Sequence, residues 1–182
     1  MQTVKIVVTG PFSAGKTQFI QTISEIDVVA TERKISRSEE RIKDQTTVAM
    51  DFGRITIDEG LVLYLFGTPG QRRFDFMWEI LAEGMLGFVV LLDSVRPETF
   101  REARSILDTF RSYAPVPYVV AANKQDLSDA WSPEDLRIAL HIPGDIKVVS
   151  CMALDRESVR NVVLELLYSV LAMLDKEESA GG

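Results

Sequence analysis

The stretch GPFSAGKT, Gly10–Thr17, has the residue types and the spacing of a phosphate-binding loop. It matches the pattern G-x-x-x-x-G-K-[ST] and lies between a strand-like apolar run and a segment of helical periodicity. In such a loop, backbone N–H groups and the helix N-terminus bind phosphate, the lysine reaches the β- and γ-phosphates, and the hydroxyl ligates Mg²⁺. The sequence therefore predicts Thr17 as a metal ligand and a phosphate site made of Phe12, Ser13, Ala14, Gly15, Lys16, Thr17 and Gln18.

A second stretch, NKQD at residues 123–126, has the residue types of a guanine-binding loop. The Asp126 carboxylate can accept hydrogen bonds from guanine N1–H and the exocyclic amine, whereas adenine would leave this charge unpaired. Alone, four polar residues after a strand are more often a solvated turn, but a phosphate loop upstream makes guanine the better interpretation. The stretch SCM follows the last predicted strand, where a backbone N–H could meet guanine O6. The predicted guanine-binding residues are Asn123, Lys124, Asp126, Ser150, Cys151 and Met152.

The elements that position these motifs are short apolar runs alternating with segments of helical length. This alternation predicts an α/β fold with a mostly parallel sheet, in which ligands bind at the carboxyl ends of the strands. Helices are predicted at residues 15–25, 96–114, 132–140 and 156–176, one of them with Ser132 as its N-cap. Residues 27–43 read as a long polar loop or a poorly ordered region, and the sequence leaves open whether this segment adds a strand or slides between states. Strands are predicted at Val4–Gly10, Gly87–Asp93, Val116–Asn123 and near residue 148, and a β-hairpin around residues 58–60.

Length and composition indicate one globular domain without a nucleic-acid partner. The chain has 182 residues, 46% of them hydrophobic, and a net charge of -7, which argues against binding to nucleic acid or to an anionic membrane surface. No apolar run is long enough to span a membrane, and no signal peptide or lipid-anchor motif is expected at either end. The single Cys151 fits a reducing compartment, so a cytoplasmic location is expected.

The chain resembles the Ras superfamily of small GTPases over nearly all of residues 3–174. GPFSAGKT, TTVAMDF, TPGQ, NKQD and SCM occur in the family's order and spacing. The resemblance is closest to the prokaryotic branch, the bacterial polarity and gliding GTPases and the conservon-type small GTPases. It implies a Ras-like P-loop NTPase fold with six strands in the order 2-3-1-4-5-6, strand two antiparallel, and helices on both faces. It also implies GTP/GDP and Mg²⁺ as cofactors and a roadblock/longin-type regulator or other GTPase-activating partner.

The same resemblance assigns roles in the switch regions. Thr47, or Thr46 as the alternative, would ligate Mg²⁺ and sense the γ-phosphate. Gln71 would orient the attacking water, and the Gly70 N–H would contact the γ-phosphate. Residues 1–176 would form the GTPase domain and residues 177–182 a flexible tail.

Two residues depart from the family pattern. Gly67 stands where an Asp usually holds Mg²⁺ through a water, and Asp51, Asp58 and Asp93 remain open as substitutes. Phe12 replaces a usual Gly and is expected to impair hydrolysis. We therefore expect a molecular switch with slow intrinsic GTP hydrolysis that a partner accelerates. A scaffold that binds nucleotide without hydrolysis is the alternative, and a P-loop kinase or ATPase is disfavoured by NKQD.

Other features carry weaker interpretations. Cations at Arg41, Lys43, Arg72 and Arg73 are candidates to replace a missing arginine finger, although mobile-loop charges are more often merely solvated. Trp78, with Phe74, Phe76 and Met77, is either packed beneath the switch, which is favoured slightly, or part of a partner-binding patch.

Overall fold

The computed structural model describes residues 1–28, 31–35, 46–70 and 75–182, and only the backbone of residues 31–35 and 46–49. The described strands form one sheet in the order β2-β3-β4-β1-β5-β6-β7. All neighbours from β4 to β7 pair in parallel, whereas β3 is antiparallel to both β2 and β4. The strands are β1 (Gln2–Thr9), β2 (Thr31–Ile35), β3 (Thr46–Asp58), β4 (Leu61–Gly67), β5 (Gly87–Asp93), β6 (Tyr118–Asn123) and β7 (Val148–Ser150).

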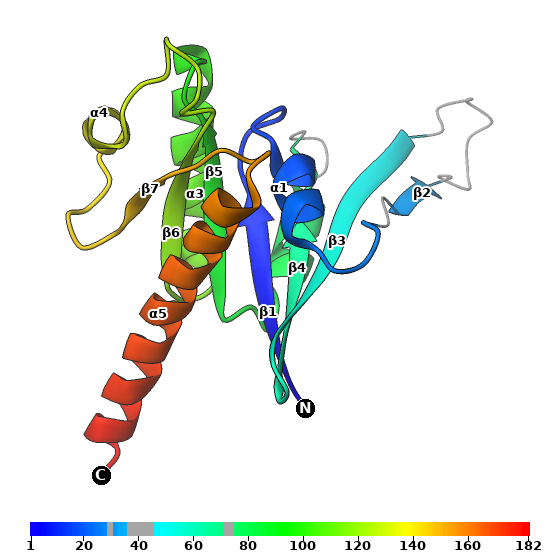
Figure 1. Cartoon of the computed structure of the whole chain (residues 1–182), viewed down its shortest axis with the longest axis vertical. Helices are drawn as coiled ribbons and strands as arrows, with labels where there is room; N and C mark the ends of the chain where they lie inside the picture. The colour runs from blue at the N-terminus through cyan, green and yellow to red at the C-terminus, as the bar shows by residue number, and fades with distance from the viewer. Residues whose placement is uncertain (29–30, 36–45, 71–74) are drawn as a thin grey trace.

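This topology confirms the predicted fold class. The predicted strands one to six correspond to β1, β3, β4, β5, β6 and β7, and their order and the antiparallel second strand are as expected. The structure adds β2 at the edge of the sheet, within the segment for which the sequence predicted a loop. Figure 1 shows β2 and the far end of β3 reaching away from the other strands.

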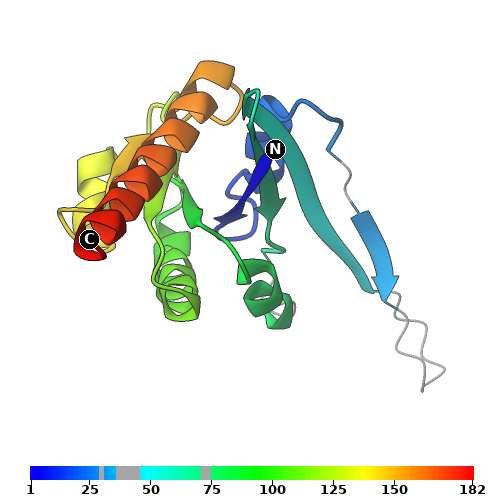
Figure 2. The ribbon, with the colours of Figure 1, turned by 90° about the horizontal axis from the view of Figure 1, so that it is seen from below.

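Helices cover both faces of the sheet. The helices α1 and α5 pack on one face against alternate residues of the central strands, for example Ile6 and Leu91. The helices α2, α3 and α4 pack on the other face against the intervening residues, for example Val7 and Val90. Figure 2 shows these two layers on opposite sides of the strands. The helical elements are α1 (Lys16–Ile23), α2 (Phe76–Ala82), the 3-10 turn η2 (Pro97–Thr99), α3 (Phe100–Tyr113), α4 (Pro133–Ala139) and α5 (Arg156–Ala180).

Helix ends follow local chemistry. Ser132 is the N-cap of α4, as predicted, and its hydroxyl accepts a hydrogen bond from the Asp135 N–H. The last helix continues to Ala180, four residues into the segment predicted to be a flexible tail. No helix in the described part of the chain is both long enough and apolar enough to cross a lipid bilayer.

The first helix packs closely on strands β3 and β4 at positions that are occupied by glycine. A Cβ atom built on Gly53 of β3 would lie 2.6 Å from Ile20 Cγ2, and one on Gly67 of β4 would lie 2.9 Å from Ile20 Cδ1. Both distances are shorter than any normal carbon contact, so the Ile20 side chain fills space that only glycine leaves free. The turn after α1 also holds β3, because the Ser24 hydroxyl accepts from the Arg54 N–H at 3.1 Å. This packing fixes the register of β3 against α1.

Candidate nucleotide-binding site

The loop after β1 has the conformation of an anion-binding nest. Gly15 has φ 105°, in the left-handed region that favours glycine, and forms the N-cap of α1. Ser13 is also left-handed, with φ 67°, and the Ala14 N–H closes a turn onto the Pro11 carbonyl at 3.1 Å. The segment thus turns directly into the N-terminus of a helix, where peptide N–H groups favour a bound anion.

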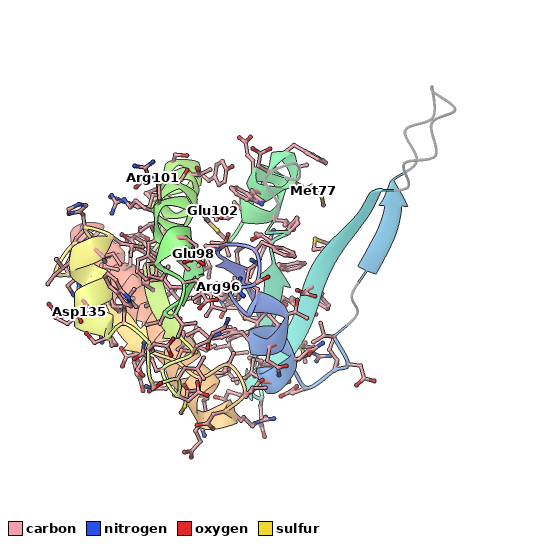
Figure 3. All side chains as sticks on the ribbon, turned by 90° about the horizontal axis from the view of Figure 1, so that it is seen from above. Met77, Arg96, Glu98, Arg101, Glu102 and Asp135 are labelled. Atoms are coloured by element: carbon pink, nitrogen blue, oxygen red, sulfur yellow. The ribbon has the colours of Figure 1, made fainter. Side chains whose placement is uncertain are left out.

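Lys16 lies beneath this loop as a buried cation. Its Nζ donates hydrogen bonds to the carbonyls of Gly10 and Pro11, at 2.7 and 2.8 Å. Burial lowers the pKa of Lys16 to about 8, while the nearby carboxylates of Asp51 and Glu102 act in the opposite direction. Figure 3, which looks onto this edge of the sheet, shows Glu102 near the start of α3. The ammonium is held by two neutral carbonyls, so an incoming phosphate would be a stronger partner for it.

Thr17 is paired with a carboxylate from another strand. Its hydroxyl donates to Asp51 Oδ2 at 2.6 Å, and Asp51 is only 8% exposed. A hydroxyl that donates its proton to a carboxylate turns its lone pairs outward, which suits a metal ligand. The Thr17–Asp51 pair therefore supplies both a ligand oxygen and a buried negative charge beside the phosphate loop.

Asp51 also occupies the space beside Gly67. The two residues are register partners in the β3–β4 pair. A Cβ atom built on Gly67 would lie 3.0 Å from Asp51 Cβ and 3.2 Å from Asp51 Oδ2. Of the three carboxylates considered from the sequence, Asp58 lies in the exposed β3–β4 turn and Asp93 is bonded to Lys124. Asp51 alone among these three contacts the phosphate end.

Asn123 connects the phosphate loop to the loop after β7. Its Nδ2 donates to the Ala14 carbonyl at 2.9 Å, and its Oδ1 accepts from the Ala153 N–H at 2.9 Å. The side chain is buried, so both bonds form away from water. A Cβ atom at Gly15 would lie 2.6 Å from Asn123 Nδ2, which explains why glycine is needed there. One amide thus joins the ends of three strands into a single site.

The remaining residues of NKQD divide into an anchored pair and a free carboxylate. Lys124, with φ 67°, donates from Nζ to Asp93 Oδ2 at 2.7 Å, and Asp93 also faces Arg96 Nε at 3.5 Å. Figure 3 shows Arg96 in the loop after β5. Gln125 Nε2 donates to the Ser94 hydroxyl at 3.0 Å. Asp126 is exposed, and in the described part of the chain its carboxylate has no hydrogen-bond partner. It is therefore available to a ligand.

In the loop after β7, the backbone N–H groups that are free to bind a ligand are not those expected from the sequence. The Cys151 N–H donates to the Ala122 carbonyl at 2.9 Å, and the Met152 N–H donates to the Ser158 hydroxyl at 2.8 Å. The Leu154 N–H has no partner among the described residues. Sequence reasoning could not identify it, because a backbone N–H carries no residue signature. Ser150 is exposed at the end of β7.

Cys151 is buried in an apolar environment, which raises the pKa of its thiol to about 12. A thiol with so high a pKa is protonated at neutral pH and is a poor nucleophile. Its contribution to the site is therefore structural.

The segment after β4 lies against the phosphate loop. A Cβ atom at Gly70 would lie 2.8 Å from Phe12 Cα and 2.9 Å from Lys16 Nζ, so the Gly70 backbone reaches the predicted phosphate position. Trp78 of α2 fixes this turn, since its indole N–H donates to the Pro69 carbonyl at 3.0 Å. Trp78 is buried against Phe110, with ring centroids 5.7 Å apart, which confirms the packing interpretation.

Several predicted residues lie outside the described side chains. Gln71 and Phe74 fall in an undescribed segment, as do the candidate cations at positions 41, 43, 72 and 73. The backbone of Thr47 belongs to β3, where it pairs with Lys34, and Thr46 pairs with Ile35. Phe12 projects from the phosphate loop and is 62% exposed. Phe76 is exposed on α2, next to Met77, which is half-buried and labelled in Figure 3.

Together these residues can hold a nucleotide by its two ends. The phosphate loop, Lys16 and Gly70 surround an anion site, while Asp126 and the Leu154 N–H offer one acceptor and one donor to a base. No three His, Cys, Asp or Glu side chains cluster as a metal site within residues 1–28, 50–70 and 75–182. A cation at Thr17 would therefore depend on Asp51, water and the phosphates for its other partners, which fits the chemistry of Mg²⁺.

Known proteins are similar to this chain over most of its length. The family described as conserved hypothetical ATP binding protein matches residues 26–178, a range that begins after the phosphate loop. An uncharacterized protein of Methanocaldococcus jannaschii is 33% identical over 131 residues, which cover 72% of this chain and 76% of that protein. The mutual gliding-motility protein MglA of Myxococcus xanthus is 30% identical over 149 residues, 75% of each chain.

The similarity extends to eukaryotic proteins. ADP-ribosylation factor-like protein 3 of Saccharomyces cerevisiae is 28% identical over 167 residues, which cover 87% of this chain and 81% of that protein. A Ras-related Rab protein of Dictyostelium discoideum is 23% identical over 188 residues. This protein belongs to the family described as conserved hypothetical ATP binding protein, and its homologues are Arf-, Rab- and Ras-like small GTPases.

Proposed function

We propose that this protein is a guanine-nucleotide switch that binds GTP and GDP with Mg²⁺ and hydrolyses GTP slowly. The observation that carries the proposal is the Asn123 amide, which joins the phosphate loop to the loop after β7 beside the exposed Asp126 carboxylate. A site that is joined in this way places one ligand's phosphates and base at fixed separation. Binding of γ-phosphate near Gly70 and Thr47 would distinguish the GTP state from the GDP state.

Guanine is favoured over adenine by the chemistry of the base end, although the matching family is described as binding ATP. The exposed Asp126 carboxylate can accept hydrogen bonds from both guanine N1–H and the exocyclic amine, whereas adenine offers neither donor in that arrangement. The Leu154 N–H, rather than that of Cys151 or Met152, would donate to guanine O6. This assignment moves the predicted O6 contact two or three residues along the loop.

Competition between nucleotides tests the base assignment. A fluorescent GDP analogue bound to the purified protein should be displaced by GTP and GDP but not by ATP at the same concentration. The Asp126→Asn variant replaces an acceptor with a donor, so its affinity for GDP should fall by more than about 100-fold. Xanthosine diphosphate, whose base has a carbonyl in place of the amine, should bind this variant better than GDP does. Displacement of the analogue by ATP would contradict the proposal.

Mg²⁺ would be held by Thr17 with Asp51 behind it. The Asp51 carboxylate would take the place of the family's usual Asp at position 67, a role supported by its position beside Gly67 and its bond to Thr17. Thr47 would complete the site in the GTP state if the far end of β3 moves toward the phosphates.

Gln71 would orient the attacking water, and single-turnover hydrolysis tests its role. Protein preloaded with GTP and Mg²⁺ should hydrolyse it slowly, and Gln71→Ala should slow it further by roughly 10–100-fold. The exposed Phe12, which projects from the loop beside Gly70, motivates the alternative of a scaffold that binds nucleotide without hydrolysis. The scaffold would be favoured if the wild type and Gln71→Ala both bind GTP tightly and show the same hydrolysis rate, with or without a partner.

A partner protein would accelerate hydrolysis. We propose a place in the prokaryotic branch, which the similarity to MglA supports, and a roadblock/longin-type regulator as the partner. Such a regulator from the same organism should raise the single-turnover rate of the wild type but not that of Gln71→Ala. Rapid hydrolysis by the isolated chain would contradict the need for a partner.

A further inference from the structure

The last helix, α5, has two apolar faces, and the fold uses only one of them. Val159, Val162, Val163, Leu166 and Val170 face the core. On the opposite side Leu164 is half-buried, Tyr168 is 59% exposed and Leu171 is 56% exposed. These three residues follow one another at steps of four and three, the spacing of a stripe that packs against another helix.

The helix also extends past the body of the protein. Val170 is its last buried residue, yet α5 continues for ten more residues, to Ala180. Figure 1 shows this C-terminal part of α5 projecting away from the sheet. Leu174 lies on this projecting part and is 39% exposed. Most helical stability in proteins comes from packing of an apolar face, so a partner surface would stabilise this overhang, which has no buried residue after Val170.

Charge on the same stripe indicates what that partner is. One helical step before the apolar residues lies Arg160, and one step after them lies Asp175, both exposed. Neither side chain makes an ion pair within the described part of the chain. The first two turns of α5 carry two arginines and one glutamate, whereas residues 175–178 carry one lysine and three acidic residues. A second α5 running antiparallel would match these opposite ends, and a parallel one would oppose like charges.

We propose that this protein forms a two-fold symmetric homodimer through antiparallel packing of α5 on α5. The register that sets Leu164 against the partner's Leu171 also sets Arg160 against the partner's Asp175, and it brings the two copies of Tyr168 together at the axis. The proposal rests on α5 alone and is independent of the proposed nucleotide chemistry. One helix face is smaller than the roughly 800 Å² per partner of a standard interface, so dissociation in the micromolar range is expected.

Sedimentation equilibrium of the full chain tests the dimer. The wild type should associate reversibly between roughly 1 and 200 µM, a range chosen to bracket a micromolar constant. Leu171→Glu should abolish the dimer, because it places a charge in the apolar stripe. Ile138→Glu, on the exposed face of α4, is the matched control and should leave the dimer intact. A wild type that stays monomeric at the highest concentration overturns the proposal, and so does a dimer that Leu171→Glu does not weaken.

Charge reversal tests the antiparallel register. Arg160→Asp and Asp175→Arg should each weaken the dimer on the order of tenfold, since each occurs twice across the axis. The double variant should restore the wild-type constant, because it exchanges the two charges. Circular dichroism and nucleotide affinity should stay unchanged throughout, which separates dimer loss from misfolding. If the two single substitutions weaken the dimer additively and the double variant does not restore it, the register is wrong. If α5 binds another protein and not a second copy, the wild type and all variants will be monomeric, which overturns the proposal.

Discussion

The proposed role of Asp51 at the Mg²⁺ site, in place of a carboxylate at position 67, predicts a specific pattern of Mg²⁺ dependence. Asp51→Asn keeps the shape of the side chain and removes its charge. The Thr17 hydroxyl then donates at 2.6 Å to a neutral oxygen, which weakens that hydrogen bond by about 1–1.5 kcal/mol. Loss of an outer carboxylate at a metal site costs roughly 10–100-fold in metal affinity. We therefore expect the Mg²⁺ concentration that half-stabilises bound nucleotide to rise by roughly 10–100-fold.

The complementary substitution, Gly67→Asp, introduces a second carboxylate beside Asp51. Its Cβ would lie 2.9 Å from Ile20 Cδ1 and 3.0 Å from Asp51 Cβ, so neighbours must shift. Overpacking of this kind typically costs about 1–3 kcal/mol of stability. In the double variant Asp51→Asn/Gly67→Asp, one charge remains at the site. Its Mg²⁺ dependence should return to within about tenfold of the wild type if position and charge are interchangeable.

The assay is the dissociation rate of a fluorescent GDP analogue, measured over a titration of free Mg²⁺. Asp58→Asn, at the exposed β3–β4 turn, is the control and should behave as the wild type. A change of less than about threefold in Asp51→Asn would refute the assignment, because even the weakened hydrogen bond alone predicts more. Equal effects in Asp58→Asn would show that the response is general and does not come from the site.

Three further outcomes are expected. Asn123→Ala leaves the Ala14 carbonyl and the Ala153 N–H without their hydrogen-bond partner. Chemical denaturation should therefore show that the free energy of unfolding falls by about 2–6 kcal/mol. A fall of less than about 1 kcal/mol would contradict the stabilising role of the Asn123 amide. The pKa of Lys16 is lowered to about 8, so the folded protein loses this proton at lower pH than the unfolded chain does. The stability of the ligand-free protein should therefore rise between pH 8 and 10.5, while its affinity for GDP falls. The Lys16→Arg variant, which stays charged, should show neither trend. Trp78→Phe removes the donor to the turn after β4 but keeps an aromatic core contact, so hydrolysis should slow by roughly tenfold with GDP affinity unchanged; a fall in GDP affinity would instead indicate general loosening.

The sequence was most informative where a motif is contiguous and carries its chemistry in residue types. The phosphate loop and NKQD both lie where expected, since each follows a strand whose apolar run is readable. The sequence left open whether residues 27–43 add a strand, because TERKI has no apolar alternation and the pairing of β2 with β3 depends on tertiary context. Helix α2 was also missed, since its seven residues, Phe76–Ala82, are too few to show a reliable period.

Within the site, the relations between side chains were beyond sequence reasoning. Asp51 was one of three candidate carboxylates, and only the register of β3 against β4 separates it from the others. The double role of Asn123 depends on two backbone groups from loops far apart in the chain. The choice among N–H groups after β7 depends on which are already bonded, a property of the folded loop and not of residue type.

The contact of Ile20 with two glycines has a mechanical consequence. A slip of β3 along its neighbours by two residues, the smallest that keeps each side chain on its face, would bring Asp51 or Ile55 to the place of Gly53. Even one added carbon atom there would lie 2.6 Å from Ile20 Cγ2, so a steric clash with α1 opposes sliding of β3. This contact therefore opposes sliding of the strand that carries Asp51 past the helix after the phosphate loop. An approach of Thr47 to a bound phosphate would then come from bending of β3 between Thr47 and Asp51.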